Sequence, residues 1–364
     1  MNWKTLGLLG LLVLLLGACD REPQHETSVA RSDVQRTGIY QAAGGALQSQ
    51  AWRADGASYL EAAPAVADQT VIWGGRDGTL RAQSLQEGGS LWTLRLDGPI
   101  VASVTVSGGE VYVGTEAGSL YKVGLTSGQV IEQMAIGSGV TTTPLLVKDR
   151  IILGCADGRL LAYDAARKTV LWTVQTGGAI EGDPALADGL LYFGSQDGFL
   201  RAVELASGKE RWRIETRGAI VSAPAVAKGR VYFGSRNRNF YAVEAATGKL
   251  VWRFRAANEI RSSAAVTDQL VIFGCDIGMV YALSLDQGKE VWTFKTKGMI
   301  DSAPVVAGKT VYFGSRDRHV YAVDLATGAP QKQWEASSWI MADPVPVANG
   351  LLVATRKGEL LRLL

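Results

Sequence analysis

Residues 222–254 read SAPAVAKGRVYFGSRNRNFYAVEAATGKLVWRF, and this stretch carries the pattern that decides the fold. It contains four short apolar runs, at 222–226, 230–234, 240–244 and 250–254. Turn residues rich in Gly, Asn and Lys separate the runs. Alternating apolar runs of this length, divided by such residues, are typical of antiparallel strands joined by tight turns. The stretch therefore predicts one four-stranded antiparallel sheet.

The same unit recurs every 40 residues from residue 45 to the end of the sequence. A series of glycines marks it, with Ala354 in the eighth place: Gly74, Gly114, Gly154, Gly194, Gly234, Gly274 and Gly314. Tryptophans form a second series, which Glu132 interrupts and from which Trp334 is displaced by two positions: Trp52, Trp92, Trp172, Trp212, Trp252 and Trp292. Four-stranded units repeated around an axis are the pattern of a β-propeller. We predict an all-β, eight-bladed propeller over 49–364, with four antiparallel strands per blade.

The two ends of the repeat array predict how the ring closes. Residues 359–364 form a third strand with no fourth strand after it, whereas residues 50–54 form a fourth strand with no first three before it. Pairing these two segments would remove the exposed strand edge that each would otherwise present. We therefore expect the N-terminal strand to complete blade eight, with Trp52 at the closure.

The first residues form a targeting signal rather than part of the fold. Residues 6–18 are an apolar stretch of 13 residues behind Lys4, shorter than the roughly 20 residues that a membrane-spanning helix needs. Leu16-Gly17-Ala18-Cys19 resembles a bacterial lipobox. That resemblance implies cleavage after a signal peptide of residues 1–18 and a lipid on Cys19. A plain secretory signal with a chance cysteine is the alternative.

Residues 19–48 lead from this signal to the propeller. They are polar and show no sustained periodicity, so we expect a flexible tether. Asp20 resembles the inner-membrane retention signal of enterobacterial lipoproteins. The expected location is the cell envelope, lipid-anchored and facing the periplasm, with the outer membrane favoured and the inner membrane kept open because of Asp20.

The segment 241–252, YAVEAATGKLVW, resembles the tryptophan-docking motif of PQQ-type propeller repeats. In this motif the tryptophan on the outermost strand packs against the glycine-containing turn of a neighbouring blade. Two branches share the repeat: quinoprotein dehydrogenases, and BamB-like lipoproteins that assist outer-membrane protein assembly. A lipobox ahead of eight blades is more similar to the second branch. The resemblance implies a non-catalytic scaffold for protein partners, with the outer-membrane barrel-assembly machinery as the expected partner.

Nothing in the sequence predicts a catalytic, cofactor-binding or metal site. Quinoprotein dehydrogenases generally carry a vicinal cysteine pair, whereas Cys155 and Cys275 lie three blades apart, too far for a disulfide. We expect both to be buried small residues. The two histidines of the sequence do not make a zinc site or a catalytic dyad. A net charge of +2 gives no excess of positive charge of the kind that binds nucleic acid.

The central funnel supports an alternative function. Four charged residues lie at the start of the innermost strands, near the funnel mouth: Glu61, Glu181, Arg261 and Asp301. Arg261 and Asp301, on adjacent blades, are placed to pair with each other. Glu181 with Asp183 could ligate a cation, although two carboxylates make a thin site. The alternative is a protein that binds a quinone or a sugar-like ligand in the funnel, as a relative of PQQ-dependent oxidoreductases.

One face of the ring is a candidate for partner binding. In an up-and-down blade, the turn between the second and third strands and the link to the next blade share one face. The large apolar residues at the link are Tyr59, Met299 and Trp339, on blades one, seven and eight, which are consecutive around the ring; Met341 follows closely. Basic residues at the turns accompany them: Arg76, Arg316, Arg318 and Arg356. Aromatic, Met and Arg side chains are enriched in interface cores, so we expect a protein partner to dock there.

Two readings of this face stay open. Trp339 and Tyr59 could instead fold inward over the funnel, leaving the arginines as a solvated rim. Arg238 and Arg318 stand where most repeats have glycine, so either the turn differs or these arginines are kept for contact at a conformational cost of about 1–2 kcal/mol. BamB-like proteins commonly carry insertions between repeats. This sequence has almost none, so no partner-binding residue can be transferred to it.

Overall fold

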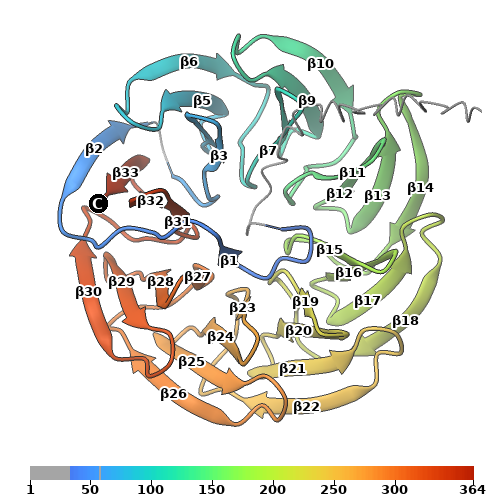
Figure 1. Cartoon of the computed structure of the whole chain (residues 1–364). Helices are drawn as coiled ribbons and strands as arrows, with labels where there is room; N and C mark the ends of the chain where they lie inside the picture. Colours follow the sequence, from blue (N-terminus) through green and yellow to red (C-terminus); the bar gives the residue numbers. More distant parts are fainter. Residues whose placement is uncertain (1–32, 57–58) are drawn as a thin grey trace, which may run out of the picture.

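The computed structural model describes residues 33–56 and 59–364, which form a closed ring of eight antiparallel sheets (Figure 1). The described residues contain strands and turns only. Successive strands of a blade pair from the centre of the ring outward. This arrangement confirms the predicted eight-bladed propeller.

The first four blades have strands of matching length. Blade one contains β3 (Ala65–Ala67), β4 (Thr70–Gly74), β5 (Thr79–Ser84) and β6 (Ser90–Arg95). Blade two contains β7 (Thr105–Ser107), β8 (Glu110–Gly114), β9 (Ser119–Gly124) and β10 (Val130–Ala135). Blade three contains β11 (Leu145–Val147), β12 (Arg150–Gly154), β13 (Arg159–Asp164) and β14 (Thr169–Gln175). Blade four contains β15 (Ala185–Ala187), β16 (Leu190–Gly194), β17 (Phe199–Glu204) and β18 (Glu210–Glu215).

The last four blades continue this register. Blade five contains β19 (Ala225–Ala227), β20 (Arg230–Gly234), β21 (Asn239–Glu244) and β22 (Leu250–Arg255). Blade six contains β23 (Ala265–Val266), β24 (Leu270–Gly274), β25 (Met279–Ser284) and β26 (Glu290–Lys295). Blade seven contains β27 (Val305–Ala307), β28 (Thr310–Gly314), β29 (His319–Asp324) and β30 (Pro330–Glu335). Blade eight contains β31 (Val345–Val347), β32 (Gly350–Ala354) and β33 (Glu359–Leu363), together with β2 (Gln50–Asp55) from the N-terminal side.

The ring is closed by β2, which lies at the perimeter beside β33 (Figure 1). The two strands are antiparallel, with Trp52 opposite Arg362 and Asp55 opposite Glu359. Blade eight therefore has four strands, three from the C-terminal end and one from the N-terminal end. The closure predicted from the repeat phase is confirmed.

Neighbouring blades are joined at the perimeter by the tryptophans of the outermost strands. In the six tryptophans that keep the repeat phase, the indole Nε1 donates a hydrogen bond to the carbonyl oxygen 33 residues later, in the next blade; Trp252 reaches Leu285 at 3.0 Å. The ring lies over the glycine of that blade's outer turn, and a Cβ on Gly288 would be 2.5 Å from Trp252. Where Glu132 replaces the tryptophan, Lys168 replaces the facing glycine, and their side chains form a 2.7 Å ion pair.

The hydrophobic core lies between adjacent blades rather than in one central mass. Between blades five and six, Phe240 stacks on Phe273 with ring centroids 4.1 Å apart, and Tyr232, Trp252 and Tyr281 belong to the same buried cluster. The glycine series of the second strands keeps this spacing, because a Cβ on Gly234 would stand 2.3 Å from the Ile260 side chain of the next link. Large apolar surface is thus buried by stacking blades on one another.

The chain before β2 forms a strap along the channel, which corrects part of the predicted tether of 19–48. From Val34 to Gly38 the strap accepts one backbone hydrogen bond from the innermost strand of each of blades four to seven; the donors are Leu186, Val226, Val266 and Val306. β1 (Ile39–Tyr40) then pairs in parallel with β27, near the centre of Figure 1. Backbone hydrogen bonding to successive blades, rather than a periodic side-chain pattern, orders this segment.

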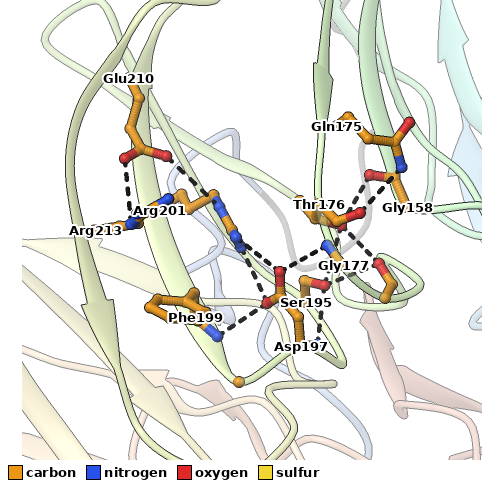
Figure 2. A network of polar contacts seen from close by, with 12 residues as sticks. Gly158, Gln175, Thr176, Gly177, Ser195, Asp197, Phe199, Arg201, Glu210 and Arg213 are labelled. Atoms are coloured by element: carbon orange, nitrogen blue, oxygen red, sulfur yellow. Dashed lines mark hydrogen bonds and ion pairs between the residues drawn. The ribbon is translucent and has the colours of Figure 1, made fainter.

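Polar side chains connect the turn between the second and third strands of a blade to the link that precedes that blade (Figure 2). The Asp197 carboxylate accepts hydrogen bonds from the Arg201 guanidinium at 2.7 and 3.0 Å, and from the backbone N–H of Gly177 in the previous link at 2.9 Å. Burial by itself raises the pKa of Asp197. The hydrogen bonds from Arg201, Gly177 and Phe199 together lower the pKa by more than burial raises it, so the pKa lies below its ordinary value.

We expect Asp197→Asn to lower the free energy of unfolding at pH 7 by about 1.5–3 kcal/mol, the usual range for hydrogen bonds to a charged group. Because the folded-state pKa is depressed, this contribution is present above the unfolded-state pKa and is lost as the pH falls through the folded-state pKa. Denaturation at pH 7 and at pH 3 measures both effects. Asp188→Asn, at an exposed turn, serves as the control; an equal loss at both pH values would contradict the account.

Candidate partner-binding face

The links between blades and the turns between second and third strands lie together on one face of the ring. In every blade, the backbone N–H of the turn residue donates to the carbonyl of the link residue 17 positions earlier, as Arg356 does to Trp339 at 2.8 Å. The equivalent distances are 3.0 Å for Arg316 to Met299 and 3.3 Å for Arg76 to Tyr59. The apolar link residues and the basic turn residues of blades seven, eight and one are therefore neighbours on one surface.

Four of these side chains form a continuous stack, which we call the aromatic–arginine ladder: Arg316, Trp339, Arg356 and Tyr59. The Trp339 ring lies between two guanidinium groups, with Arg316 at 5.4 Å and Arg356 at 4.7 Å from its centroid. Arg356 also lies 4.9 Å from the centroid of Tyr59. Each contact is in the range of a cation–π interaction. The ladder fixes the orientation of long side chains that would otherwise be mobile.

The apolar members of the face stay accessible to a partner. Tyr59 is 47% exposed, Met299 40% and Trp339 37%. Neither Trp339 nor Tyr59 lines the funnel, whereas Met341 does. The inward-folded alternative for the two aromatic residues is therefore not what the structure adopts, and Met341 belongs to the funnel wall rather than to the ladder.

Two of the basic residues at the turns are neutralised within their own blade by a carboxylate 15 positions earlier. Arg76 Nε lies 3.0 Å from Glu61, and the Arg316 guanidinium contacts Asp301 through both Nε and Nη2, the latter at 3.0 Å. Arg261 and Asp276 form the same pair with the charges exchanged, at 2.9 Å. Arg261 and Asp301 thus pair with these partners and not with each other.

Arg318 lies apart from the ladder and forms an ion pair with Glu335 at 2.5 Å. Its φ is 75°, and the φ of Arg238 is 72°, matching the positive φ of the glycines at this position in other blades. The turn conformation is therefore kept in both blades. Because the arginines take a left-handed conformation that glycine adopts without strain, each carries the cost expected from the sequence.

The central funnel is a cavity of about 220 Å³ on the same face. Five carboxylates line it: Glu61, Glu181, Asp183, Asp301 and Asp343. From the strap, the fully buried Arg36 places Nη1 3.6 Å from Asp183, and its Nε donates to the Pro184 carbonyl at 3.4 Å. Asp343 and Arg36 were not singled out from the sequence, whereas Asp183 was, as a possible cation ligand together with Glu181.

The funnel carries few groups for redox or metal chemistry. Within residues 33–56 and 59–364, no group of three His, Cys, Asp or Glu side chains is placed to hold a metal ion. Cys155 and Cys275 are buried free thiols, and burial raises the pKa of Cys155 to about 12. A thiol with so high a pKa is almost entirely protonated at neutral pH and is a poor nucleophile.

Comparison with known proteins places the chain in a family. The model of the family described as outer membrane protein assembly factor BamB matches residues 35–167 and 156–363. The chain belongs to the BamB family. The BamB proteins of Escherichia coli K12 and Shigella dysenteriae are each 29% identical to it over 157 residues, a match that spans 40% of this chain and 40% of each relative.

Solved structures share the propeller fold of this chain at low identity. BamB from Moraxella catarrhalis is 17% identical, with a TM-score of 0.74 over 86% of this chain and 98% of that one. A quinohemoprotein alcohol dehydrogenase from Comamonas testosteroni is 14% identical, with a TM-score of 0.78 over 91% of this chain and 79% of that one. At these identities the likeness concerns the fold alone.

The predicted anchor cannot be placed on the structure. The signal peptide, Cys19 and Asp20 lie outside the described residues. Within the part of the chain that the structure covers, no helix is long and apolar enough to cross a membrane.

Proposed function

We propose that this BamB-family chain is a lipid-anchored scaffold that faces the periplasm and takes part in the assembly of outer-membrane β-barrel proteins. Its lipid would sit on Cys19, in the outer membrane rather than the inner one. Its task is to bind a protein component of the barrel-assembly machinery on the face of blades seven, eight and one.

The aromatic–arginine ladder is the observation that carries this proposal. A surface that presents Trp, Tyr, Met and Arg together has the composition of an interface core. The ladder side chains are already held in one arrangement by stacking, so binding would cost little side-chain entropy. Membership of the BamB family supplies the class of partner.

We propose a binding role rather than catalysis. Quinone cofactors of the PQQ type are polycarboxylates, which cationic side chains would have to hold. The arginines beside the funnel wall are already paired with its carboxylates: Arg36 with Asp183, Arg76 with Glu61 and Arg316 with Asp301. These three arginines are therefore occupied by the chain itself. The strap also runs along the innermost strands of blades four to seven, so part of the channel interior is already filled by the chain itself.

The proposal is tested by purifying the native lipoprotein in a gentle detergent and identifying co-purified proteins by mass spectrometry. We expect enrichment of the outer-membrane assembly barrel and its associated lipoproteins. Recovery of the protein alone, or quinone absorbance together with dehydrogenase activity, would contradict the scaffold function.

Trp339→Ala combined with Tyr59→Ala is expected to weaken partner binding by at least 10-fold, because truncating aromatic anchors of an interface typically costs more than about 1–2 kcal/mol. The affinity of the purified variant for the co-purified partner measures this. Leu91→Ala combined with Val170→Ala removes two exposed apolar side chains from outer strands instead and should leave binding unchanged. Equal binding by both double variants would rule out the ladder as the docking site.

A further inference from the structure

We infer that the partner docks by placing a carboxylate of an acidic protein segment on Arg356. This inference rests on the proposed function and deepens it by naming the chemistry of the partner at the ladder. The observations that carry it are the missing acid of blade eight, the geometry of the Arg356 guanidinium and the charges around it.

Blade eight lacks both acidic residues that accompany this turn in blades one, four and seven. At the position of Glu61 and Asp301, which neutralise Arg76 and Arg316, blade eight has Met341. At the turn position that is Asp197 or Asp317 elsewhere, it has Lys357. Within the described residues, the structure gives the Arg356 guanidinium no carboxylate and no hydrogen-bond acceptor, so its charge is uncompensated.

The donor that is left over on Arg356 is the one used for carboxylates elsewhere on the face. Arg356 Nε is buried and has no hydrogen-bond partner. In Arg76, Arg236 and Arg316 the same atom contacts Glu61, Glu259 and Asp301 at 3.0, 2.8 and 2.5 Å. A buried donor without a partner costs about 1–3 kcal/mol. Because Nε itself is closed to solvent, a carboxylate from outside would contact the other N–H groups of the guanidinium and neutralise its charge.

The guanidinium is already positioned to receive such a group. Tyr59 and Trp339 hold it between their rings at 4.9 and 4.7 Å, and its planar fork matches a carboxylate in two-point contact. Of the charged side chains at neighbouring positions, Arg316 is neutralised by Asp301, whereas Lys357 is exposed and adds a positive charge that favours an anion. The apolar surfaces of Met299, Trp339 and Tyr59 around the charge fit a protein segment better than a free ion, because they offer contact area that a small anion would leave uncovered.

Met341→Asp in the full-length lipoprotein tests the inference, because it supplies Arg356 with a carboxylate from its own blade. We expect it to weaken binding of the co-purified partner by at least 10-fold while leaving Trp339 and Tyr59 in place. Val221→Asp is the matched control, since it makes the same kind of change at the same repeat position in blade five, beside Arg236. That variant should bind as the wild type does.

The salt dependence and a small-anion probe complete the design. Arg356→Met, which keeps the bulk of the side chain and removes its charge, should also weaken binding at least 10-fold and reduce its dependence on NaCl concentration. If sodium phosphate alone displaces the partner from the wild type at submillimolar concentration, the Arg356 guanidinium binds a free anion rather than a protein carboxylate, and the inference is overturned.

The outcomes separate the two proposals. Wild-type binding that Trp339→Ala with Tyr59→Ala abolishes, but that Met341→Asp and Arg356→Met leave intact, overturns the carboxylate contact and keeps the docking face. If the wild-type protein binds no partner at all, both proposals are overturned.

Discussion

Trp252→Ala is expected to lower the free energy of unfolding by about 3–5 kcal/mol, the usual cost of truncating a buried tryptophan. The indole is buried, covers Gly288 of blade six and donates its N–H to the Leu285 carbonyl. Removing it opens a cavity between two blades and leaves a carbonyl without its donor. Chemical denaturation followed by circular dichroism measures the change in midpoint and in the free energy of unfolding.

Trp339→Ala is the matched control for this prediction. It removes the same side chain from the exposed face, where two cation–π contacts of about 0.5–1 kcal/mol each and part of the covered ring surface are lost, and should therefore cost less than Trp252→Ala. If the two substitutions destabilise the protein equally, the tryptophan contacts between blades do not carry the stability that we assign to them.

Arg36→Ala is expected to lower the free energy of unfolding by about 3–5 kcal/mol, because removing one member of a buried ion pair leaves the other charge uncompensated. Arg36 is fully buried and lies beside Asp183 in the funnel. Its loss would also loosen the strap, since Gln35 and Thr37 on either side accept backbone hydrogen bonds from Val226 and Val266. Amide hydrogen exchange at these two valines should become faster.

Arg217→Ala is the control for Arg36, since its side chain is 86% exposed and 3.9 Å from Glu215. An exposed pair of this kind contributes about 0–1 kcal/mol. Unchanged exchange at Val226 and Val266 in the Arg36 variant would show that the strap is held without the arginine.

Much of the fold could be predicted because its causes repeat. Gly74 and its equivalents recur where the next link packs closely, and the strand signals recur with them, so one unit such as 222–254 predicts all eight. The closure by β2 followed from the same phase. The strap could not be predicted in this way. Its backbone hydrogen bonds from Val34 to Gly38 need no particular side chains, and its buried Arg36 occurs once rather than in each repeat, so neither leaves a periodic signal.

The candidate site was partly readable for the same reason. The repeat phase brought Tyr59, Trp339 and Arg356 to one face, and the structure places them in contact. The phase did not indicate which charges are neutralised, because ion pairing depends on side-chain direction as well as position. Arg318 forms an ion pair with Glu335, and Arg316 forms one with Asp301. The Met341 side chain lines the funnel.

We propose that the ladder face of blades seven, eight and one binds a component of the barrel-assembly machinery. Photo-crosslinking in living cells tests it most directly, with a benzophenone amino acid placed at Met299, beside the ladder, or at Val170 on the outer strand β14. The account predicts a cross-link from position 299 to an outer-membrane assembly protein and none from position 170. A cross-link from position 170 alone would contradict it.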